Sequence, residues 1–256
     1  YDNQSTDKSV EIIKNFKDEK IKYFKSDKLL NLGSVRKLSY DQCRGSFITF
    51  LDTDDYWTEL KLEKQVKKFE DNNEIDVLYS NYFLNNNKNI EKKIKKLFRG
   101  YCQSKIIESY INGSPLTAWL TLMIKKDSID KLEYSFDSKT HISSDFDLII
   151  RLSSFSNFDY LDDYLAYYRV HDGNESKNQQ KEIYELIYVV NKFKNEKKLQ
   201  KIFCYKNFLF KLYTKYFIHK KLEDNLDKNL NIINIFNVKL IYFLIKIFPN
   251  KILKFF

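Results

Sequence analysis

The stretch Phe47-Ile48-Thr49-Phe50-Leu51-Asp52-Thr53-Asp54-Asp55-Tyr56-Trp57 decides the fold of this chain. Four of its first five residues are apolar, which predicts a buried strand over 47–51. Such a strand cannot carry three carboxylates into a core, because unpaired ionised groups there are too unfavourable. The acids are therefore expected at the carboxyl end of the strand, where open α/β sheets bind ligands. Clustered carboxylates at that place suit Mg²⁺ or Mn²⁺, which usually arrives with a substrate phosphate.

Helices and strands alternate around this stretch, which predicts an α/β fold with a mixed, mostly parallel sheet flanked by helices. Hydrophobic periodicity and capping residues give the expected boundaries. Helices are expected over 6–16, 34–43, 59–70, 103–111, 127–132 and from Ser143 or Ser144 to 152. Ser5 is expected to cap the first helix and Thr58 the third, and a turn at 31–33 precedes the second. Strands are expected over 20–24, 47–51, 75–82, 119–124 and 158–170, with a polar break at 162–163, and 85–96 is expected to be a surface excursion.

The character of the sequence changes near Ser176, which predicts a catalytic domain over 1–176 and a helical C-terminal region over 177–256. The end of that region, 232–256, reads IINIFNVKLIYFLIKIFPNKILKFF. On a helix Lys239, Lys246 and Asn250 share one narrow stripe, and the longest apolar run is too short to span a bilayer. Two interpretations stay open, an interfacial membrane anchor or a helix packed on the preceding domain.

The composition limits the class of protein. The chain has 256 residues and a formal net charge of +9, with its lysines dispersed, which argues against nucleic-acid binding. A basic chain also suits phosphorylated substrates or an anionic membrane surface. The three cysteines, Cys43, Cys102 and Cys204, have no paired spacing. They predict neither a zinc site nor a disulfide framework and fit a cytoplasmic location.

Several motifs follow one another in a fixed order: Asp2 to Asp7, Asn31-Leu32-Gly33 with Arg36, the acidic stretch with Lys61 to Gln65, Ser144-Asp145, and Tyr167 to His171. This order closely resembles the inverting family 2 glycosyltransferases, which have a GT-A fold, over roughly residues 1–176. The resemblance implies transfer from a nucleotide-sugar donor, a UDP-sugar first, to a glycan or lipid-linked acceptor in bacterial surface polysaccharide synthesis. It also makes the C-terminal tail a candidate contact with the inner face of the plasma membrane.

By this resemblance Asp54 is a direct ligand of Mn²⁺ or Mg²⁺, and His171 completes the metal shell once the donor is bound. A cation between the phosphates stabilises the charge of the leaving group. Asp52 is then expected to contact the ribose or a metal-bound water, and Asp55 to support the loop at the nucleotide. The alternatives are that Asp55 only flanks the helix over 59–70, and that His171 is an ordinary surface or core histidine.

Asp145 matches the catalytic base of the family, which takes the proton of the acceptor hydroxyl. Ser144 stands where the family usually has glutamate, and Asp147 is the fallback candidate for the base. The alternative for Asp145 is a carboxylate that only caps a helix. Trp57 and Trp119 are either stacking surfaces for a sugar or base, or packing residues.

The resemblance also places three residues at the nucleotide. Asp2 matches an aspartate that contacts the base or ribose, Asn3 stands where a second aspartate is common, and Arg36 matches an arginine near the diphosphate. The alternatives are that Asp2 and Asn3 only form a turn and cap, and that Arg36 is a solvated helix residue.

Members of the family begin with an apolar strand, a turn and a helix, a unit of roughly 30 residues. That unit is missing here, so the sequence is expected to be a piece of a longer protein whose catalytic domain lacks its first βα unit. Two other functions stay open. One is a degenerate nucleotide-sugar-binding module without turnover, and the other is a phosphatase with Asp52 as nucleophile and Asp54 as acid/base.

Overall fold

The computed structural model describes residues 1–86, 89–93, 99–100, 105–106, 109, 117–175 and 178–193. The chain divides into two compact units, Tyr1–Asn174 and Glu175–Phe256. In the second unit the described helix is α7 (Gln179–Lys192), capped by the Asn178 side chain, which accepts the N–H of Lys181 at 3.1 Å. The predicted tail over 232–256 and most of the predicted helix over 103–111 lie outside the described residues. No helix in the described ranges is long and apolar enough to cross a bilayer.

The sheet of the first unit is mixed, as the sequence predicts, but its pairs are mostly antiparallel. The strand order is β1-β5-β3-β6-β2, and β4 also pairs with β3. Among the described strands only β3 and β6 pair in parallel. The mostly parallel sheet was a wrong expectation, because alternation of helices and strands does not reveal which distant strands become neighbours. The strands are β1 (Phe47–Thr49), β2 (Tyr56–Trp57), β3 (Val77–Asn85), β4 (Ile90–Lys93), β5 (Met123–Lys125) and β6 (Phe158–Arg169).

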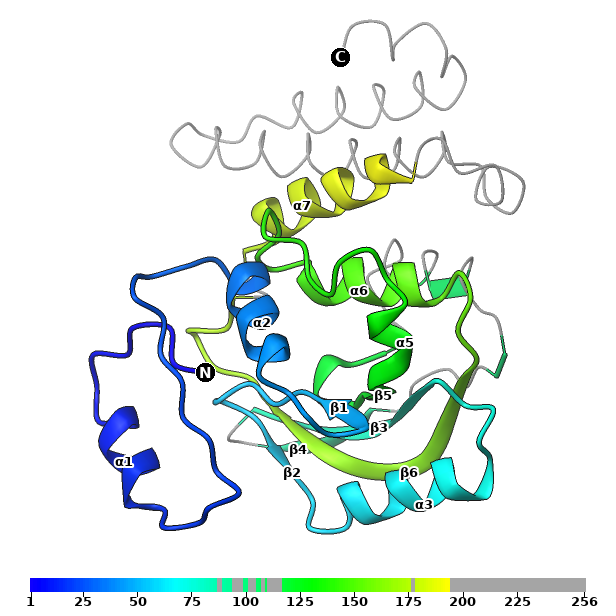
Figure 1. Cartoon of the computed structure of the whole chain (residues 1–256), viewed down its shortest axis with the longest axis horizontal. Helices are drawn as coiled ribbons and strands as arrows, with labels where there is room; N and C mark the ends of the chain where they lie inside the picture. Colours follow the sequence, from blue (N-terminus) through cyan, green and yellow to red (C-terminus); the bar gives the residue numbers. More distant parts are fainter. Residues whose placement is uncertain are drawn as a thin grey trace, which may run out of the picture. The chain divides into compact units, whose positions relative to one another are not determined.

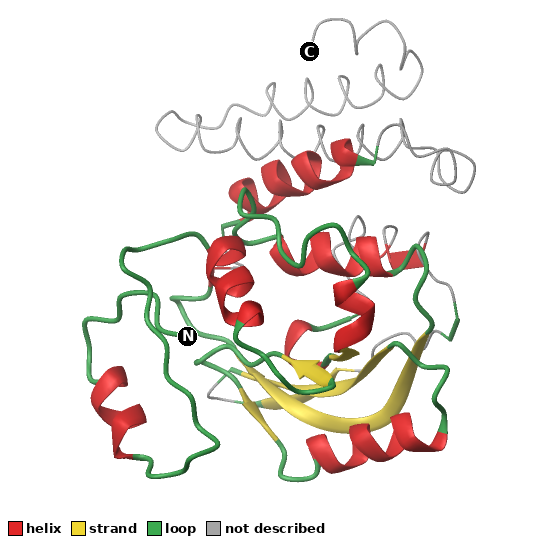
Figure 2. Cartoon of the chain, in the orientation of Figure 1, coloured by secondary structure: helices red, strands yellow, loops and turns green. Residues whose placement is uncertain are grey.

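Helices cover both faces of this sheet (Figures 1 and 2). On one face α3 contributes Phe69 to a cluster with Ile75, Leu78 and Met123. On the other face α2, α5 and α6 enclose a larger core, which forms around residues such as Tyr40, Ile129 and Leu148. The helices are α1 (Ser9–Asn15), α2 (Leu32–Asp41), α3 (Lys61–Asp71), α5 (Lys126–Asp130), α6 (Ser144–Leu152) and the 3-10 helix η1 (Trp119–Thr121).

The N-terminal arm differs from the prediction. The first helix begins at Ser9, not Thr6, and Lys8, not Ser5, is its N-cap residue. The Asp7 carboxylate accepts the N–H of Ser9 at 3.0 Å. The predicted strand over 20–24 is wrong, since this segment forms no strand, and the isolated parallel bridge nearby joins Asp2 to Lys25. None of the residues of α1 is buried, and the helix lies away from the sheet in Figure 1.

Other boundaries shift by a few residues. The α2 helix begins at Leu32, within the predicted turn. Thr58 does not cap α3, since Leu60 is its N-cap residue and the Thr58 hydroxyl donates to Leu165 O at 3.3 Å. The segment predicted as a strand over 119–124 divides into η1 and β5. The predicted surface excursion over 85–96 contains β4, whose hairpin with β3 pairs residues such as Tyr82 and Lys93.

The predicted polar break in β6 is a real irregularity. The register with β3 moves from the pair Ser80 and Leu161 directly to the pair Asn81 and Tyr164, so Asp162 and Asp163 are skipped. The buried Asn81 donates its side-chain N–H to Asp162 Oδ1 at 2.8 Å, which fixes the extra residues in place. Such a bulge bends a strand and re-aims the side chains beyond it.

Gly33 lets α2 approach the loop before α6 closely. Its N–H binds Thr140 O at 3.1 Å. A Cβ added at Gly33 would lie 2.1 Å from Asp137 O and 2.6 Å from Thr140 O, both backbone atoms. Only glycine fits at such a contact, so this residue determines how α2 docks beside the start of α6.

We expect Gly33→Ala to destabilise the chain by about 1–3 kcal/mol, because backbone must move to admit the methyl group. Gly45→Ala is the matched control, since the nearest atom to its added Cβ is Phe47 O at an ordinary 3.5 Å. Thermal and urea unfolding of both variants provide the measurement. Equal effects of the two substitutions would contradict the close-approach explanation.

Lys61 is a fully buried lysine in the first turn of α3, with 0% of its surface exposed. Its ammonium group is held by neutral atoms, Thr49 Oγ1 at 3.0 Å and Gln65 Oε1 at 2.7 Å, and lies 4.3 Å from the centre of the Trp57 ring. Burial lowers the pKa of Lys61 from 10.5 to about 7. Gln65 in turn donates to Thr121 O at 2.8 Å, so this lysine joins α3 to β1 and η1.

The free energy of unfolding should rise with pH above about 7. Below that pH the folded and unfolded chains both carry the Lys61 proton, whereas between about 7 and 10.5 the unfolded chain alone retains it. This group contributes a slope of up to about 1.4 kcal/mol per pH unit in that window. Urea unfolding at pH 7.5 and 9 should show a steeper slope for the native chain than for Lys61→Met. The variant Lys67→Met, on the exposed side of the same helix, is the control. An unchanged slope in Lys61→Met would contradict the prediction.

Candidate active site

The acidic loop, defined as Asp52 to Asp55, connects β1 to β2. The loop is closed by a turn in which the Asp55 N–H binds Asp52 O at 3.0 Å. The next residue, Tyr56, pairs with Tyr167 of β6, and the Asp55 carboxylate accepts the N–H of Arg169 at 2.9 Å. The Arg169 side chain also donates to Asp54 O. The loop is therefore anchored to the end of a strand more than a hundred residues later in the chain.

Asp55 is a support of this loop. Burial raises the pKa of its carboxyl to about 6, the Arg169 N–H opposes that rise, and the negative charges of Asp54 and Asp52 add to it. The alternative of a carboxylate that flanks a helix does not describe Asp55, because its bonded partner lies in β6 and α3 begins only at Lys61. The role as loop support agrees with the geometry.

Asp54 meets His171 at the exposed side of the loop. The Asp54 Oδ2 and His171 Nε2 atoms are 2.8 Å apart, and the two side chains remain 33% and 38% exposed. Asn174, only 9% exposed, lies behind them. Its side-chain N–H groups lie 3.2 Å from Asp54 Oδ2 and 3.3 Å from His171 Nε2, and its Oδ1 accepts the His171 N–H at 2.7 Å. This turn therefore holds the imidazole against the carboxylate.

The predicted metal ligands thus lie together and fit a divalent cation. One carboxylate oxygen and one imidazole nitrogen are donors that Mn²⁺ accepts, and Mg²⁺ is usually bound through one or two carboxylates plus substrate phosphates. Within the described residues no group of three or more His, Cys, Asp or Glu side chains is arranged to hold a metal ion. Among the described side chains of these four types, Asp54 and His171 are therefore the two that could share a cation, and its other ligands would be groups of another kind.

Arg36 connects the other end of the acidic loop to α6. Its guanidinium donates through Nη1 to Ser144 Oγ, and its Nη2 lies 3.5 Å from Asp52 Oδ1. The guanidinium carbon lies 4.5 Å from the centre of the Trp119 ring. Trp119 itself stacks on Phe50 with 3.9 Å between ring centres. Arg36 is therefore not a solvated helix residue, and Trp119 is a packing residue.

Asp145 lies in the first turn of α6, beside this arginine. Burial raises the pKa of its carboxyl, whereas the Arg36 charge and the Phe146 N–H lower it and the Asp52 charge raises it further. The N–H of Phe146 donates to Asp145 Oδ1 at 2.7 Å. Neither Ser143 nor Ser144 caps this helix with its side chain.

Asp147, the fallback candidate, has a different environment. It is 0% exposed, and its Oδ2 accepts two N–H groups of Arg151, at 3.0 Å and 2.8 Å. Arg151 in turn donates to the carbonyl groups of Tyr134 and Ser135, at 2.5 Å for the first and 2.8 Å for the second. This ion pair anchors α6 to the loop before it, so the contacts of Asp147 are those of a residue that stabilises the fold.

Asp2 and Asn3 form a separate cluster in the N-terminal arm. Hydrogen bonds from the hydroxyl and N–H groups of Ser5 and from Tyr23 lower the pKa of Asp2 to about 2. The side chain of Asn3 binds both backbone groups of Leu30, at 2.8 Å and 3.0 Å. These contacts make the turn that leads into α2, and a role of either residue at a nucleotide remains a prediction.

Sequence reasoning gave no role to Arg169 or Asn174. Both belong to the segment that carries His171, and their signal is the run Arg169 to Asn174, in which Asp172-Gly173-Asn174 marks a turn.

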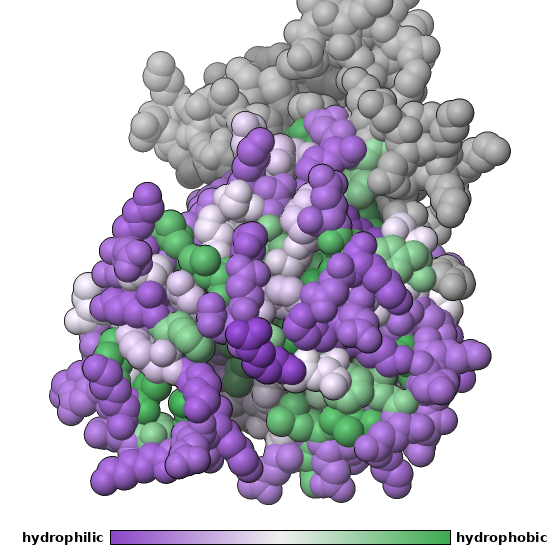
Figure 3. All heavy atoms as spheres, in the orientation of Figure 1, coloured by the Kyte–Doolittle hydropathy of each residue, from purple (hydrophilic) through white to green (hydrophobic). Residues whose placement is uncertain are grey.

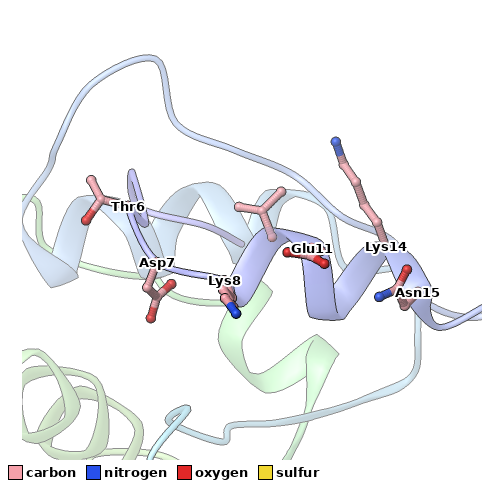
Figure 4. Close-up of a pocket in the computed structure, with 7 residues that line it drawn as sticks. Thr6, Asp7, Lys8, Glu11, Lys14 and Asn15 are labelled. Carbon is pink, nitrogen blue, oxygen red and sulfur yellow. The ribbon is translucent and has the colours of Figure 1, made fainter.

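A separate pocket in the N-terminal arm is lined by none of the predicted site residues (Figure 4). It is lined by Thr6, Asp7, Lys8, Val10, Glu11, Lys14 and Asn15. The described surface in Figure 3 is hydrophilic over most of the face in view.

Comparisons with solved structures identify the fold. A crystal structure of S. aureus TarS aligns with a TM-score of 0.63 at 15% identity, covering 90% of this chain and 65% of that chain. A second, in complex with UDP-GlcNAc, aligns with a TM-score of 0.63 at 16% identity, over 90% of this chain and 66% of that one. The chain thus spans just under two thirds of these structures. Both are GT-A glycosyltransferases, which confirms the predicted fold.

Comparisons of sequence identify the family. An uncharacterized glycosyltransferase of Methanocaldococcus jannaschii is 33% identical over 245 residues, 90% of this chain and 83% of the relative. The Escherichia coli protein WfaP, named as a UDP-Glc:alpha-D-GlcNAc-diphosphoundecaprenol beta-1,3-glucosyltransferase, is 27% identical over 71% of this chain and 68% of its own length. The family model described as Glycosyl transferase family 2 matches residues 1–132. The predicted family is confirmed and the phosphatase alternative falls away: this chain belongs to glycosyl transferase family 2.

Proposed function

We propose that this chain transfers a sugar from a UDP-sugar to a hydroxyl group of a lipid-linked diphosphate glycan, with inversion, in bacterial surface polysaccharide synthesis. The observation that carries the proposal is the meeting of Asp54 with His171, 2.8 Å apart, at a loop whose other end adjoins Arg36 and Asp145. The name of WfaP, a UDP-Glc-dependent enzyme acting on a lipid diphosphate, supports this donor and acceptor class. Peripheral contact with the cytoplasmic face of the membrane follows from such an acceptor.

The donor end of the site would hold the nucleotide diphosphate. We assign Asp54 and His171 as ligands of Mn²⁺ or Mg²⁺, and Asp52, whose side chain is 52% exposed, as a contact to the ribose. A bound cation supplies positive charge where the diphosphate leaves. Asp55 and Arg169 keep the loop in the conformation that presents these carboxylates. Asp2 and Asn3 would border the nucleotide from the N-terminal arm.

Asp145 would act at the acceptor end. Its carboxylate accepts the proton of the acceptor hydroxyl while that oxygen forms a bond to the anomeric carbon and the bond to the diphosphate breaks. Attack from the side opposite the leaving group inverts the configuration. Burial raises the pKa of Asp145, which makes its carboxylate a stronger base than a solvated aspartate. Activity should therefore fall at acid pH as this carboxyl becomes protonated.

We expect Asp54→Ala to abolish Mn²⁺-dependent binding of UDP and to leave the melting temperature nearly unchanged. Asp54 has one third of its side chain exposed, so its removal opens no core cavity. Calorimetric titration of UDP with Mn²⁺, and again with EDTA, measures the effect. Asp41→Ala, an exposed carboxylate paired with Lys37, is the control. Full Mn²⁺-dependent binding in a folded Asp54→Ala protein would overturn the metal assignment.

We expect Asp145→Asn to lower turnover by about 10²- to 10⁴-fold, because the amide cannot accept a proton. Affinity for UDP should change little. Release of UDP from UDP-glucose with a synthetic GlcNAc-diphosphate lipid, measured from pH 5 to 8, tests this.

Asp147→Asn separates the two carboxylates of α6. Breaking its buried pair with Arg151 should lower stability by about 3–5 kcal/mol, an effect of unfolding and not of chemistry. A stable Asp147→Asn protein with lost turnover, beside an active Asp145→Asn protein, would show that the base is misassigned.

A further inference from the structure

We propose that Arg36 is a positioning residue for Asp145: its guanidinium, fixed by Ser144, Asp52 and Trp119, keeps a permanent positive charge beside the carboxylate that takes the acceptor proton. This inference rests on the proposed function, in which Asp145 is the base. It differs from the role near the diphosphate that family resemblance gives to Arg36.

The geometry holds the Arg36 guanidinium in place from several sides. Its Nη1 donates to Ser144 Oγ, its Nη2 faces Asp52 Oδ1 at 3.5 Å, and the flat face of the group lies over Trp119 at 4.5 Å. Only 14% of its side chain is exposed. A guanidinium held on two edges and one face is preorganised, so its charge has a fixed place at the start of α6.

Ser144 explains how this arrangement is built. It directly precedes Asp145 in the first turn of α6 and is itself fully buried. A hydrogen bond from Arg36 to Ser144 Oγ therefore places the guanidinium next to the residue that carries the base. A carboxylate at position 144 would bind the arginine more strongly and draw its charge away from Asp145, whereas a hydroxyl anchors the group without neutralising it.

The charged groups that act on Asp145 come from two elements. Arg36 of α2 lowers the pKa of its carboxyl, and Asp52 of the acidic loop raises it. From α6 itself the N–H of Phe146 lowers it. His141, in the loop before α6, is turned to α2, where its Nδ1 accepts the N–H of Leu32 at 3.0 Å. Arg36 is thus the cation that opposes the effects of burial and of Asp52 on the pKa of this carboxyl.

The test is a titration of the Asp145 carboxyl in the full chain without ligand, by carbon NMR with ¹³C-labelled aspartate and assignment through Asp145→Asn. Arg36→Met retains most of the apolar stem over Trp119 and removes the charge. We expect it to raise the pKa of Asp145 by about one to three pH units. Arg36→Lys should restore most of the native value. Lys37→Met, which removes a charge from the exposed side of the same helix, should leave it unchanged.

Calorimetric titration of UDP with Mn²⁺ on the same proteins separates this role from diphosphate binding. Because Arg36→Met also removes the charge that faces Asp52, the comparison uses Arg36→Lys, which keeps that charge and should bind UDP within about threefold of the native value. An unchanged Asp145 titration in a folded Arg36→Met protein would overturn the inference, as would an equal rise in Lys37→Met. Absence of UDP binding by the native chain would refute the proposed function, whereas the carboxyl titration reports on Arg36 in either case.

Discussion

Three carboxylates within four residues repel one another, and the site depends on how each of them is matched. Asp52 faces the guanidinium of Arg36, Asp54 meets His171, and Asp55 accepts a backbone N–H from the end of β6. These partners come from two segments that are far apart in the sequence, α2 and the end of β6 with the turn that follows it. The acidic loop can keep its conformation only when α2, β6 and the turn after β6 are all in place. Because these carboxylates repel one another, the conformation of the acidic loop depends on the correct folding of the first unit.

The carboxylate end of the site and its base are tied through one arginine. The Arg36 guanidinium contacts Asp52 through Nη2 and Ser144 through Nη1, so a displacement of the acidic loop would shift groups at the start of α6. The other anchor of α6 is the buried pair of Asp147 and Arg151, which fixes the helix to the loop before it. Asp147 stabilises the fold and Asp145 is the proposed base, although they stand only two residues apart in the helix.

The sequence predicted the strand before the acidic loop and the helices around it, because short-range periodicity and capping are local properties. The order of the motifs also singled out Arg36, Asp54 and His171, which the structure brings to the acidic loop and whose roles stay predictions. It also predicted the irregularity at Asp162 and Asp163, since two adjacent acids interrupt an apolar strand. It did not predict the antiparallel partners of β1 and β2, because pairing between distant strands leaves no local pattern. Nor did it predict the contacts of Asn174 or the double hold on Arg36, which depend on side chains brought together only by the tertiary fold.

The bulge in β6 also sets which changes of chain length this protein can absorb. Two residues are already looped out between Leu161 and Tyr164, so a further insertion there would enlarge an existing irregularity. A second register shift lies between Tyr164 and Tyr167, and from Tyr167 the strand runs in register to Arg169, whose N–H must reach Asp55. A one-residue insertion after Tyr167 would turn the side chains beyond it to the opposite face of the sheet and carry His171 away from Asp54. Natural variation in the length of β6 is therefore expected up to its irregular part, 161–167, and not between Tyr167 and His171.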